Sequence, residues 1–282
     1  SSSGEPMQDL LRQESFELPI HGGKVIDLRT LVVRDRTRSD LWCEELHVSY
    51  FPGTPLRQDI LLYLESLCQT STGSPGDEEK SVYLLRMLGT CLFRKDCDNI
   101  FILYGPTMCG KTLLLELVSE ILGGFGSVVK PEVVFDSSND AKRTDLIDLL
   151  GKRFAYMEEL EDDQTINSAV MKRICGATYR VRENYARQSD AKAQKFQGTL
   201  VLATNHHPLF ATEDMAVFQR LSVVPLHHPN EKSPEFKRKM KQPMFLDAMF
   251  TMMCEAASNV LEKQPNFVLL EHPYHQTIGE LP

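Results

Sequence analysis

The sequence contains one run whose glycine, lysine and threonine spacing is typical of a phosphate-binding loop. Residues 105–112 read G-x-x-x-x-G-K-T, and the two glycines let successive backbone N–H groups point at phosphate oxygens. We expect Lys111 to reach the β- and γ-phosphates of a nucleotide and the Thr112 hydroxyl to ligate Mg²⁺. The candidate nucleotide-binding residues are therefore Gly105, Pro106, Thr107, Met108, Cys109, Gly110, Lys111, Thr112 and Leu113.

Two adjacent carboxylates end a second apolar stretch. Glu158 and Glu159 follow the run RFAYM at residues 153–157. Transfer of a phosphoryl group with Mg²⁺ needs one group that holds the metal and another that polarises the attacking water. We assign Glu158 to the metal, together with Thr112, and Glu159 to the water. A solvated acidic loop is the alternative, because three more acidic residues follow within the next four positions.

A third apolar stretch, residues 199–204, ends in Asn205. An amide can hydrogen-bond both the γ-phosphate and the attacking water, so Asn205 is the candidate phosphate sensor. Arg220 lies further along, directly before the apolar run 221–225. An arginine supplied in trans to a neighbour's γ-phosphate would make an oligomer the catalytic unit. A surface ion pair is the alternative role for Arg220.

The segment between the carboxylate pair and Asn205 is rich in basic residues, although the whole chain has a net charge of −8. In a ring, such a segment would face the central channel and follow a phosphate backbone without reading bases. The candidate DNA-binding residues are Lys172, Arg180, Arg182, Arg187, Lys192 and Lys195.

The elements that position these residues alternate between strand and helix. The pattern predicts strands at 100–104, 153–160, 199–205 and 217–225, with helices at 113–122, 144–150 and 167–175, a turn at 130–135 and a basic hairpin or loop at 179–197. This alternation is typical of an α/β fold with a mostly parallel sheet, in which ligands bind beyond the carboxyl ends of the strands. We therefore expect the polar strand endings to converge on one site.

The flanking regions differ from this core. Residues 16–50 alternate short apolar pieces, at 18–20, 25–28 and 46–50, with turns and predict a small β-containing lead-in, whereas residues 55–97 show helical periodicity. Residues after 231 contain a basic patch and an amphipathic helix at 245–261. We predict three parts, which are a mainly helical N-terminal domain (1–96), a P-loop ATPase core (97–226) and a C-terminal helical segment (227–282).

Composition excludes several other classes of protein. The chain is 42% hydrophobic and 25% charged, and its longest apolar runs are the length of strands, so we expect a globular protein without a membrane span. The seven scattered cysteines contain no C-x-x-C pair, which argues against a disulfide framework and a zinc site. Because no signal peptide is apparent, we expect an intracellular protein. Residues 1–4 resemble a tag remnant or the cut end of a longer protein, and they do not enter the fold prediction.

The order of the motifs resembles that of the superfamily 3 helicases, and more closely that of their poxvirus-type primase-helicase branch. The resemblance is carried by the P-loop, FAYMEE at 154–159, Lys172 followed by Gly176, TLVLATN at 199–205 and RLSVVP at 220–225. The stretches 23–30 and 46–50 are similar to the helicase-associated region of that branch. The family often has paired arginines where this chain has Gln219 and Arg220.

The resemblance implies an AAA+-type ATPase that forms a homohexameric ring, pulls single-stranded DNA through its channel and unwinds forked DNA during viral or mobile-element replication. It implies ATP and Mg²⁺ as cofactors, a primase domain or protein as a further partner, and the host cytoplasm or nucleus as the location of a viral protein. Its catalytic residues would be Lys111, Glu158, Glu159, Asn205 and Arg220. A P-loop nucleotide or small-molecule kinase and a slowly hydrolysing nucleotide switch are the alternatives.

Overall fold

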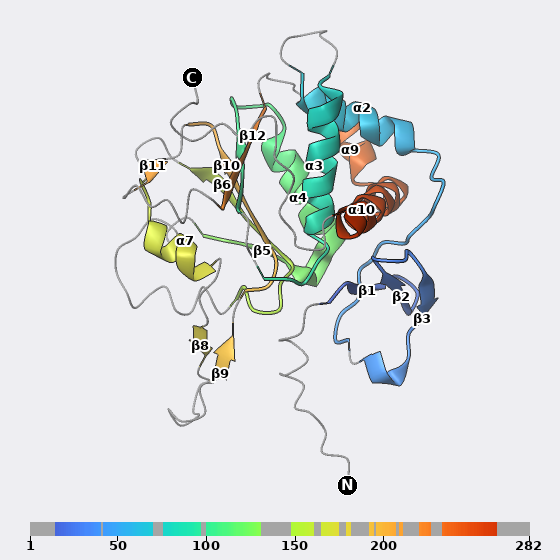
Figure 1. Cartoon of the computed structure of the whole chain (residues 1–282). Helices are drawn as coiled ribbons and strands as arrows, with labels where there is room; N and C mark the ends of the chain where they lie inside the picture. The colour runs from blue at the N-terminus through green and yellow to red at the C-terminus, as the bar shows by residue number, and fades with distance from the viewer. Residues whose placement is uncertain are drawn as a thin grey trace.

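A five-stranded parallel sheet lies at the centre of the structure (Figure 1). The computed structural model describes residues 15–40, 42–69, 76–96, 100–130, 148–160, 165–174, 179–181, 192–194, 196–206, 209–210, 220–226 and 233–263. The predicted α/β class with a parallel sheet is confirmed. The strands occur in the order β12 (Leu221–Pro225), β4 (Ile100–Tyr104), β10 (Thr199–Thr204), β6 (Phe154–Leu160) and β5 (Gly126–Val128).

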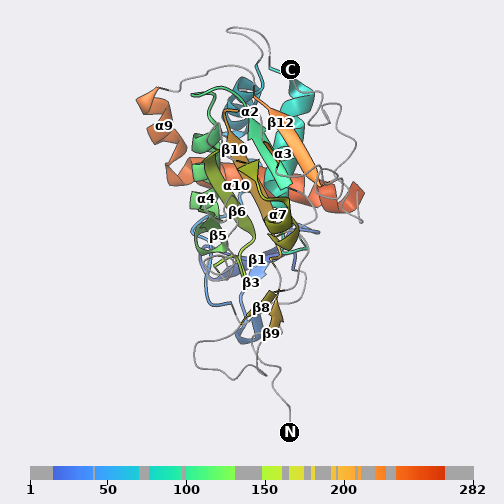
Figure 2. The same ribbon diagram turned by 90° about the vertical axis from the view of Figure 1, so that its left-hand side faces the viewer.

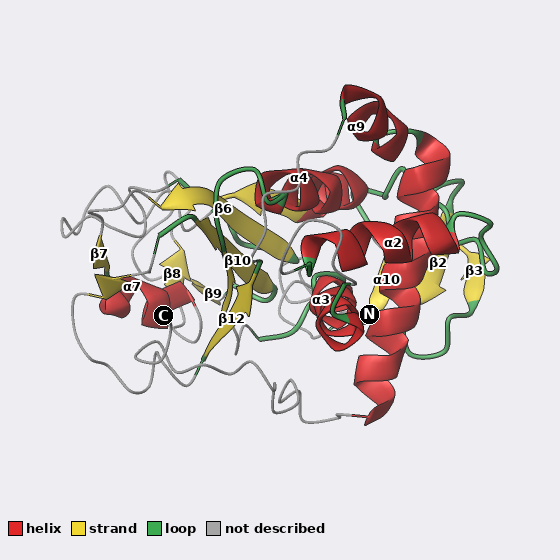
Figure 3. Cartoon of the chain, turned by 90° about the horizontal axis from the view of Figure 1, so that it is seen from above, coloured by secondary structure: helices red, strands yellow, loops and turns green. Residues whose placement is uncertain are grey.

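Both faces of this sheet are buried, each in its own apolar cluster. Along β4, Phe101 and Leu103 belong to the larger cluster, while Ile100 and Ile102 belong to the smaller one, as the two-residue period of a strand requires. The helices on the larger side include α3 (Glu78–Thr90), α4 (Lys111–Leu122) and α10 (Pro243–Lys263), and α7 (Ser168–Ile174) lies on the smaller side (Figures 1 and 3).

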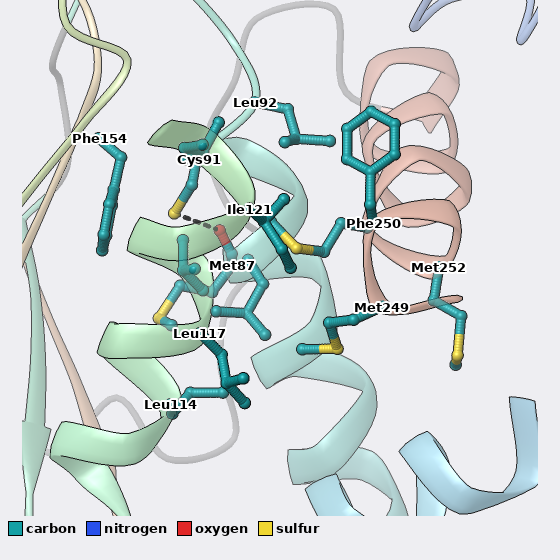
Figure 4. Packing of buried hydrophobic residues seen from close by; sticks show 14 of the residues in the cluster. Met87, Cys91, Leu92, Leu114, Leu117, Ile121, Phe154, Met249, Phe250 and Met252 are labelled. Carbon is teal, nitrogen blue, oxygen red and sulfur yellow. Dashed lines mark hydrogen bonds between the residues drawn. The ribbon is translucent and has the colours of Figure 1, made fainter. Parts of the chain in front are cut away.

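The larger cluster is formed by side chains from helices that are far apart in the sequence. Figure 4 shows this packing for Met87 of α3, Cys91 at the C-cap of α3, Leu114, Leu117 and Ile121 of α4, Met249 and Phe250 of α10, and Phe154 of the sheet. The cluster also includes Leu18 and Leu64 from the N-terminal region. All three predicted parts of the chain therefore contribute to one core. The division into three domains stays a prediction.

The N-terminal region begins with an antiparallel sheet of β1 (Glu17–Ile20), β2 (Lys24–Asp27) and β3 (Val33–Asp35), followed by a short 3-10 helix η1 (Arg38–Asp40). This sheet confirms the expected β-containing lead-in, in which residues 46–50 are irregular. Two backbone hydrogen bonds, from Leu46 N–H to the Pro19 carbonyl and from His21 N–H to the Val48 carbonyl, hold residues 46–50 beside β1. The N–H groups that follow in the chain donate to side chains of α10 instead. The Ser49 N–H donates to the Asp247 carboxylate (2.7 Å) and the Phe51 N–H to the Thr251 hydroxyl (2.9 Å).

Two helices follow, as the helical periodicity of 55–97 predicts. They are α2 (Arg57–Leu67) and α3, and the Asp77 carboxylate caps α3 by accepting the Lys80 N–H at 2.9 Å. Val82, which the periodicity places on the apolar face of α3, is 39% exposed. The reason is that α3 buries its other side against α2 and α10, where Leu84, Met87 and Leu88 are fully covered.

The remaining elements match most of the local expectations. The helix after the P-loop ends at Gly123, and η2 (Gly123–Phe125) leads into β5, which the sequence analysis did not predict. Residues 131–135 of the expected turn and residues 144–147 of the expected helix lie outside the described residues, and residues 148–150, the rest of that expected helix, form a turn instead. Short strands β7 (Thr165–Ile166) and β11 (Leu209–Phe210) pair in parallel, and α9 (Pro234–Met240) precedes α10.

Within the described residues, no helix is both long enough and apolar enough to cross a membrane. Five of the cysteines lie in this part of the chain, and each is a free thiol. Four of these thiols are buried, and Cys43 is exposed.

A buried arginine joins the N-terminal region to the start of β6. Arg153 is 1% exposed, and its guanidinium donates to the carbonyl oxygens of Leu92 (2.6 Å), Glu17 (2.6 Å) and Ser15 (3.4 Å). Trp42 and Phe125 cover the group with their rings, each 5.6 Å away. Burial, and secondarily the charge of Arg94, lowers the pKa of Arg153. The charge is compensated by backbone dipoles that come from two segments, residues 15–17 and Leu92.

We predict that Arg153→Met lowers the free energy of unfolding by about 3 kcal/mol, because it leaves buried carbonyl groups without a donor. Urea unfolding followed by circular dichroism measures this change. The control is Arg38→Met, since Arg38 is exposed on η1, and we expect a change within about 0.5 kcal/mol there. Equal effects of the two substitutions would contradict this role of Arg153.

Candidate nucleotide-binding site

The polar residues predicted to converge do follow strands that end at the same edge of the sheet. Tyr104, the last residue of β4, pairs in register with Thr204 of β10 on one side and with Pro225 of β12 on the other. Thr204 is in turn level with Leu160 at the end of β6. Gly105 and Asn205 are therefore the next residues beyond neighbouring strands, and the carboxylate pair lies just before the end of a third.

The loop after β4 has the backbone geometry of an anion cradle. Gly110 has a φ of 99° and forms the N-cap of α4, a left-handed conformation that favours glycine. Gly105 lies so close to the carbonyl oxygen of Leu226 that a Cβ there would overlap that oxygen. Both glycines of the motif are thus required by geometry, the first by a close neighbour and the second by its backbone angle.

Several N–H groups of this loop are available to an anion. Among the described residues, the backbone N–H groups of Thr107, Met108 and Gly110 donate to no protein acceptor. They lie at the N-terminal, positive end of the twelve-residue helix α4. This arrangement fits the negatively charged phosphates of a nucleotide.

Lys111 connects the loop to the end of β10. Its side chain is buried, with 6% exposure. Its Nζ donates to the carbonyl oxygens of Gly105 (2.6 Å) and Pro106 (2.9 Å) and to Oδ1 of Asn205 (2.7 Å), and it lies 3.4 Å from Sγ of Cys109. The structure therefore brings together the predicted phosphate-binding lysine and the predicted sensor amide.

The carboxylate pair lies on an irregularity of β6. Met157 pairs in register with Leu202, and Leu160 pairs with Thr204. Two residues of β6, Glu158 and Glu159, therefore face the single residue Ala203 of β10. Such a bulge is common beside active sites, because it changes the direction of side chains. Glu158 is half-buried, and the side chain of Glu159 lies outside the described part of the structure.

Glu158 shares its surroundings with Tyr156, two residues earlier on the same strand. Burial is the main cause that raises the pKa of Tyr156, and the negative charge of Glu158 adds to it. Tyr156 belongs to the larger cluster, on the face of the sheet that α4 covers. The register of β6 against β10, and of β10 against β4, places Glu158 near the end of the sheet from which the P-loop starts.

The residues near the loop fit Mg²⁺ bound together with a nucleotide. Where side chains are described, no group of three or more His, Cys, Asp or Glu residues could hold a metal ion by itself. Mg²⁺ needs no such group, because it usually takes one or two protein oxygens, water and the phosphates of its nucleotide. Thr112, half-buried in the first turn of α4, and Glu158 would supply these oxygens.

Arg220 lies at the opposite edge of the sheet, where the parallel strands begin. Its carbonyl oxygen accepts the N–H of Ile100, the first residue of β4, at 2.8 Å. The five residues of β4 separate this edge from the P-loop, which corresponds to about 15 Å at roughly 3.3 Å per residue. Arg220 thus does not join the constellation of its own chain.

The basic segment also lies away from the P-loop. Its predicted hairpin is confirmed, because β8 (Tyr179–Val181) and β9 (Lys192–Gln194) pair antiparallel just before the chain enters β10 (Figure 2). Arg180 and Lys192 are on these strands, and Lys172 is exposed on α7. Arg182, Arg187 and Lys195 lie outside the described residues.

Two contacts of the loop come from residues that the sequence analysis did not select. Leu226 follows β12 and touches Gly105, while Leu67 at the end of α2 touches Gly110. Both are ordinary apolar residues, and no local pattern separates them from other core positions. The only signal in the sequence is the pair of glycines, because a glycine permits a neighbouring residue to pack closely against its backbone.

No protein-family model matches the chain, and no curated protein matches it. Solved structures that resemble it include the apo structure of the NrS-1 C-terminal region (residues 305–718), with 14% sequence identity and a TM-score of 0.48, covering 75% of this chain and 50% of that one. The A-form apo structure of the same region has 14% identity and a TM-score of 0.46 over 75% and 49% of the two chains. This chain spans about half the length of those structures.

Proposed function

We propose that the chain binds ATP with Mg²⁺ at the edge formed by the P-loop, Asn205 and the carboxylate pair, and that it hydrolyses the nucleotide there. The observation that carries this proposal is the 2.7 Å bond between Nζ of Lys111 and Oδ1 of Asn205. A lysine that binds the γ-phosphate and an amide within its reach can hold the same phosphate from two sides.

The side chains have separate roles in this proposal. Lys111 exchanges its bonds to the loop carbonyls for phosphate oxygens, and the N–H groups of the loop bind the other phosphates. Thr112 and Glu158 hold Mg²⁺, which supplies positive charge that stabilises the transferred phosphoryl group. Glu159 polarises the attacking water, and Asn205 orients that water against the γ-phosphate.

We further propose that hydrolysis drives a DNA helicase motor of the superfamily 3 type, in which a homohexameric ring translocates on single-stranded DNA during viral or mobile-element replication. The position of Arg220 supports this proposal, because an arginine that cannot reach its own P-loop is suited to a neighbour's site. The basic hairpin supports it as well, since it lies at the edge away from the nucleotide and could follow a DNA backbone.

We predict that the ATPase rate per subunit rises with protein concentration and with single-stranded DNA, and that Lys111→Ala reduces it at least about 100-fold. The reason is that the lysine contacts the developing charge on the phosphate. Steady-state phosphate release over a wide concentration range measures this rate. A rate that ignores both concentration and DNA, yet disappears in Lys111→Ala, would contradict the motor and favour a monomeric P-loop kinase or a nucleotide switch.

A second prediction concerns Arg220. We expect Arg220→Ala to lose at least about 1000-fold in ATPase rate, and an equal mixture with Lys111→Ala to recover activity. In the mixture, an Arg220→Ala subunit keeps its P-loop lysine and can receive the arginine of a Lys111→Ala neighbour. Random assembly would restore about one quarter of the interfaces. Absence of recovery after subunit exchange would contradict a role in trans.

A third prediction concerns the hairpin. Replacing both Arg180 and Lys192 by Gln should weaken binding of single-stranded DNA and reduce the slope of log K against log salt by about 0.7 for each phosphate that the protein no longer neutralises. Fluorescence anisotropy with an oligonucleotide at several salt concentrations measures the slope. The matched control replaces Lys237 and Arg238, two exposed basic residues on α9. The assignment fails if both double variants change binding equally.

A further inference from the structure

The last residue of α2 packs directly against the P-loop. Leu67 is 1% exposed, and a Cβ built on Gly110 would lie 2.7 Å from Cδ2 of Leu67. The leucine methyl group therefore covers the backbone of Gly110 at the point where the loop becomes helix α4. This contact comes from the N-terminal part of the chain, which the sequence analysis placed in a separate domain.

Contacts along α2 fix it to the C-terminal helices. In its first turn, Arg57 forms an ion pair with Glu255 of α10 at 2.5 Å. Asp59 forms another with Lys239 of α9 at 2.6 Å. The ring of Tyr63 lies 6.0 Å from that of Phe236, also on α9. The first turn of α2 thus contacts α10 and α9, its middle contacts α9, and its last residue contacts the P-loop. Figure 3 shows α2 beside α10.

The covered position is the one on which the geometry of the loop depends. Gly110 has a φ of 99°, and its own N–H group is one of those available to phosphate. Lys111 is the next residue, so rotation about Gly110 would move its side chain and the start of α4 together. A glycine has little intrinsic preference for this conformation, and the packed leucine restricts the alternatives.

We propose that Leu67 is a positioning residue of the phosphate-binding loop, and that α2 transmits the placement of α9 and α10 to Gly110. The functional part of this inference rests on the proposed nucleotide site. Leu67 touches no substrate and acts through the backbone of Gly110. Its loss should weaken nucleotide binding more than it slows a bound nucleotide's hydrolysis.

The first test compares Leu67→Ala with Leu64→Ala by amide hydrogen exchange without nucleotide. Leu64 lies one turn earlier on α2 and is fully buried in the same cluster, so both substitutions cost stability in the same way. We expect exchange at residues 105–114, relative to a reference peptide from β10, to rise at least about fivefold in Leu67→Ala alone. Equal ratios in the two variants would overturn the proposal.

The second test uses ATP. Leu67→Ala should raise KM for ATP about tenfold and change kcat less than about threefold, because a small displacement of a positioned group is costly in binding. Leu67→Met should restore KM, and Leu64→Ala should leave it unchanged. If Leu67→Ala does not fold, Leu67→Val takes its place, since it removes less volume. A KM that is the same in all variants would overturn the proposal.

The two tests separate this inference from the proposed function. If the wild-type chain fails to bind ATP, the proposed function is wrong, while the exchange ratio still decides whether Leu67 positions the loop. If the wild type binds ATP and Leu67→Ala behaves as Leu64→Ala in both assays, the proposed function stands and the inference is wrong.

Discussion

The candidate site depends on how the structure accommodates the buried ammonium group of Lys111. An isolated buried charge is costly, so it must be surrounded by dipoles or opposite charges. Here two loop carbonyls and the amide oxygen of Asn205 lie within 3 Å of Nζ. Gly105 and Pro106 follow β4, and Asn205 follows β10. The position of the lysine therefore depends on the parallel register of two strands that are adjacent in space but far apart in sequence.

The length of the sheet separates the candidate nucleotide site from Arg220 and the basic hairpin. Its carboxyl edge carries the P-loop, Asn205 and the bulged carboxylate pair, and its opposite edge carries Arg220 and leads into the basic hairpin. Parallel strands produce this separation, because all their ends of one kind lie at one edge. Among the described residues, Arg220 is therefore separated from the P-loop of its own chain by the length of β4.

The N-terminal and C-terminal regions contribute to the same core as the sheet. Arg153 ties β1 and the end of α3 to the start of the strand that carries Glu158. Helix α2 joins α9 and α10 to Gly110. Because these contacts converge on the two ends of the sheet, displacement of either flanking region would change the geometry of the loop or of the carboxylate strand.

Local pattern by itself determined much of this protein. The P-loop motif, the three buried strands with polar endings, the presence of helices α2 and α10 and the basic hairpin were all predicted, because spacing along the chain reports periodicity and turn geometry. Only the tertiary structure decided that β4 lies between β10 and β12, that Glu158 stands on a bulge, that Arg220 is at the far edge, that residues 46–50 turn to α10 and that Leu67 covers Gly110. Each of these depends on pairing between distant segments, and local periodicity does not specify which distant partner a strand or an apolar side chain will meet.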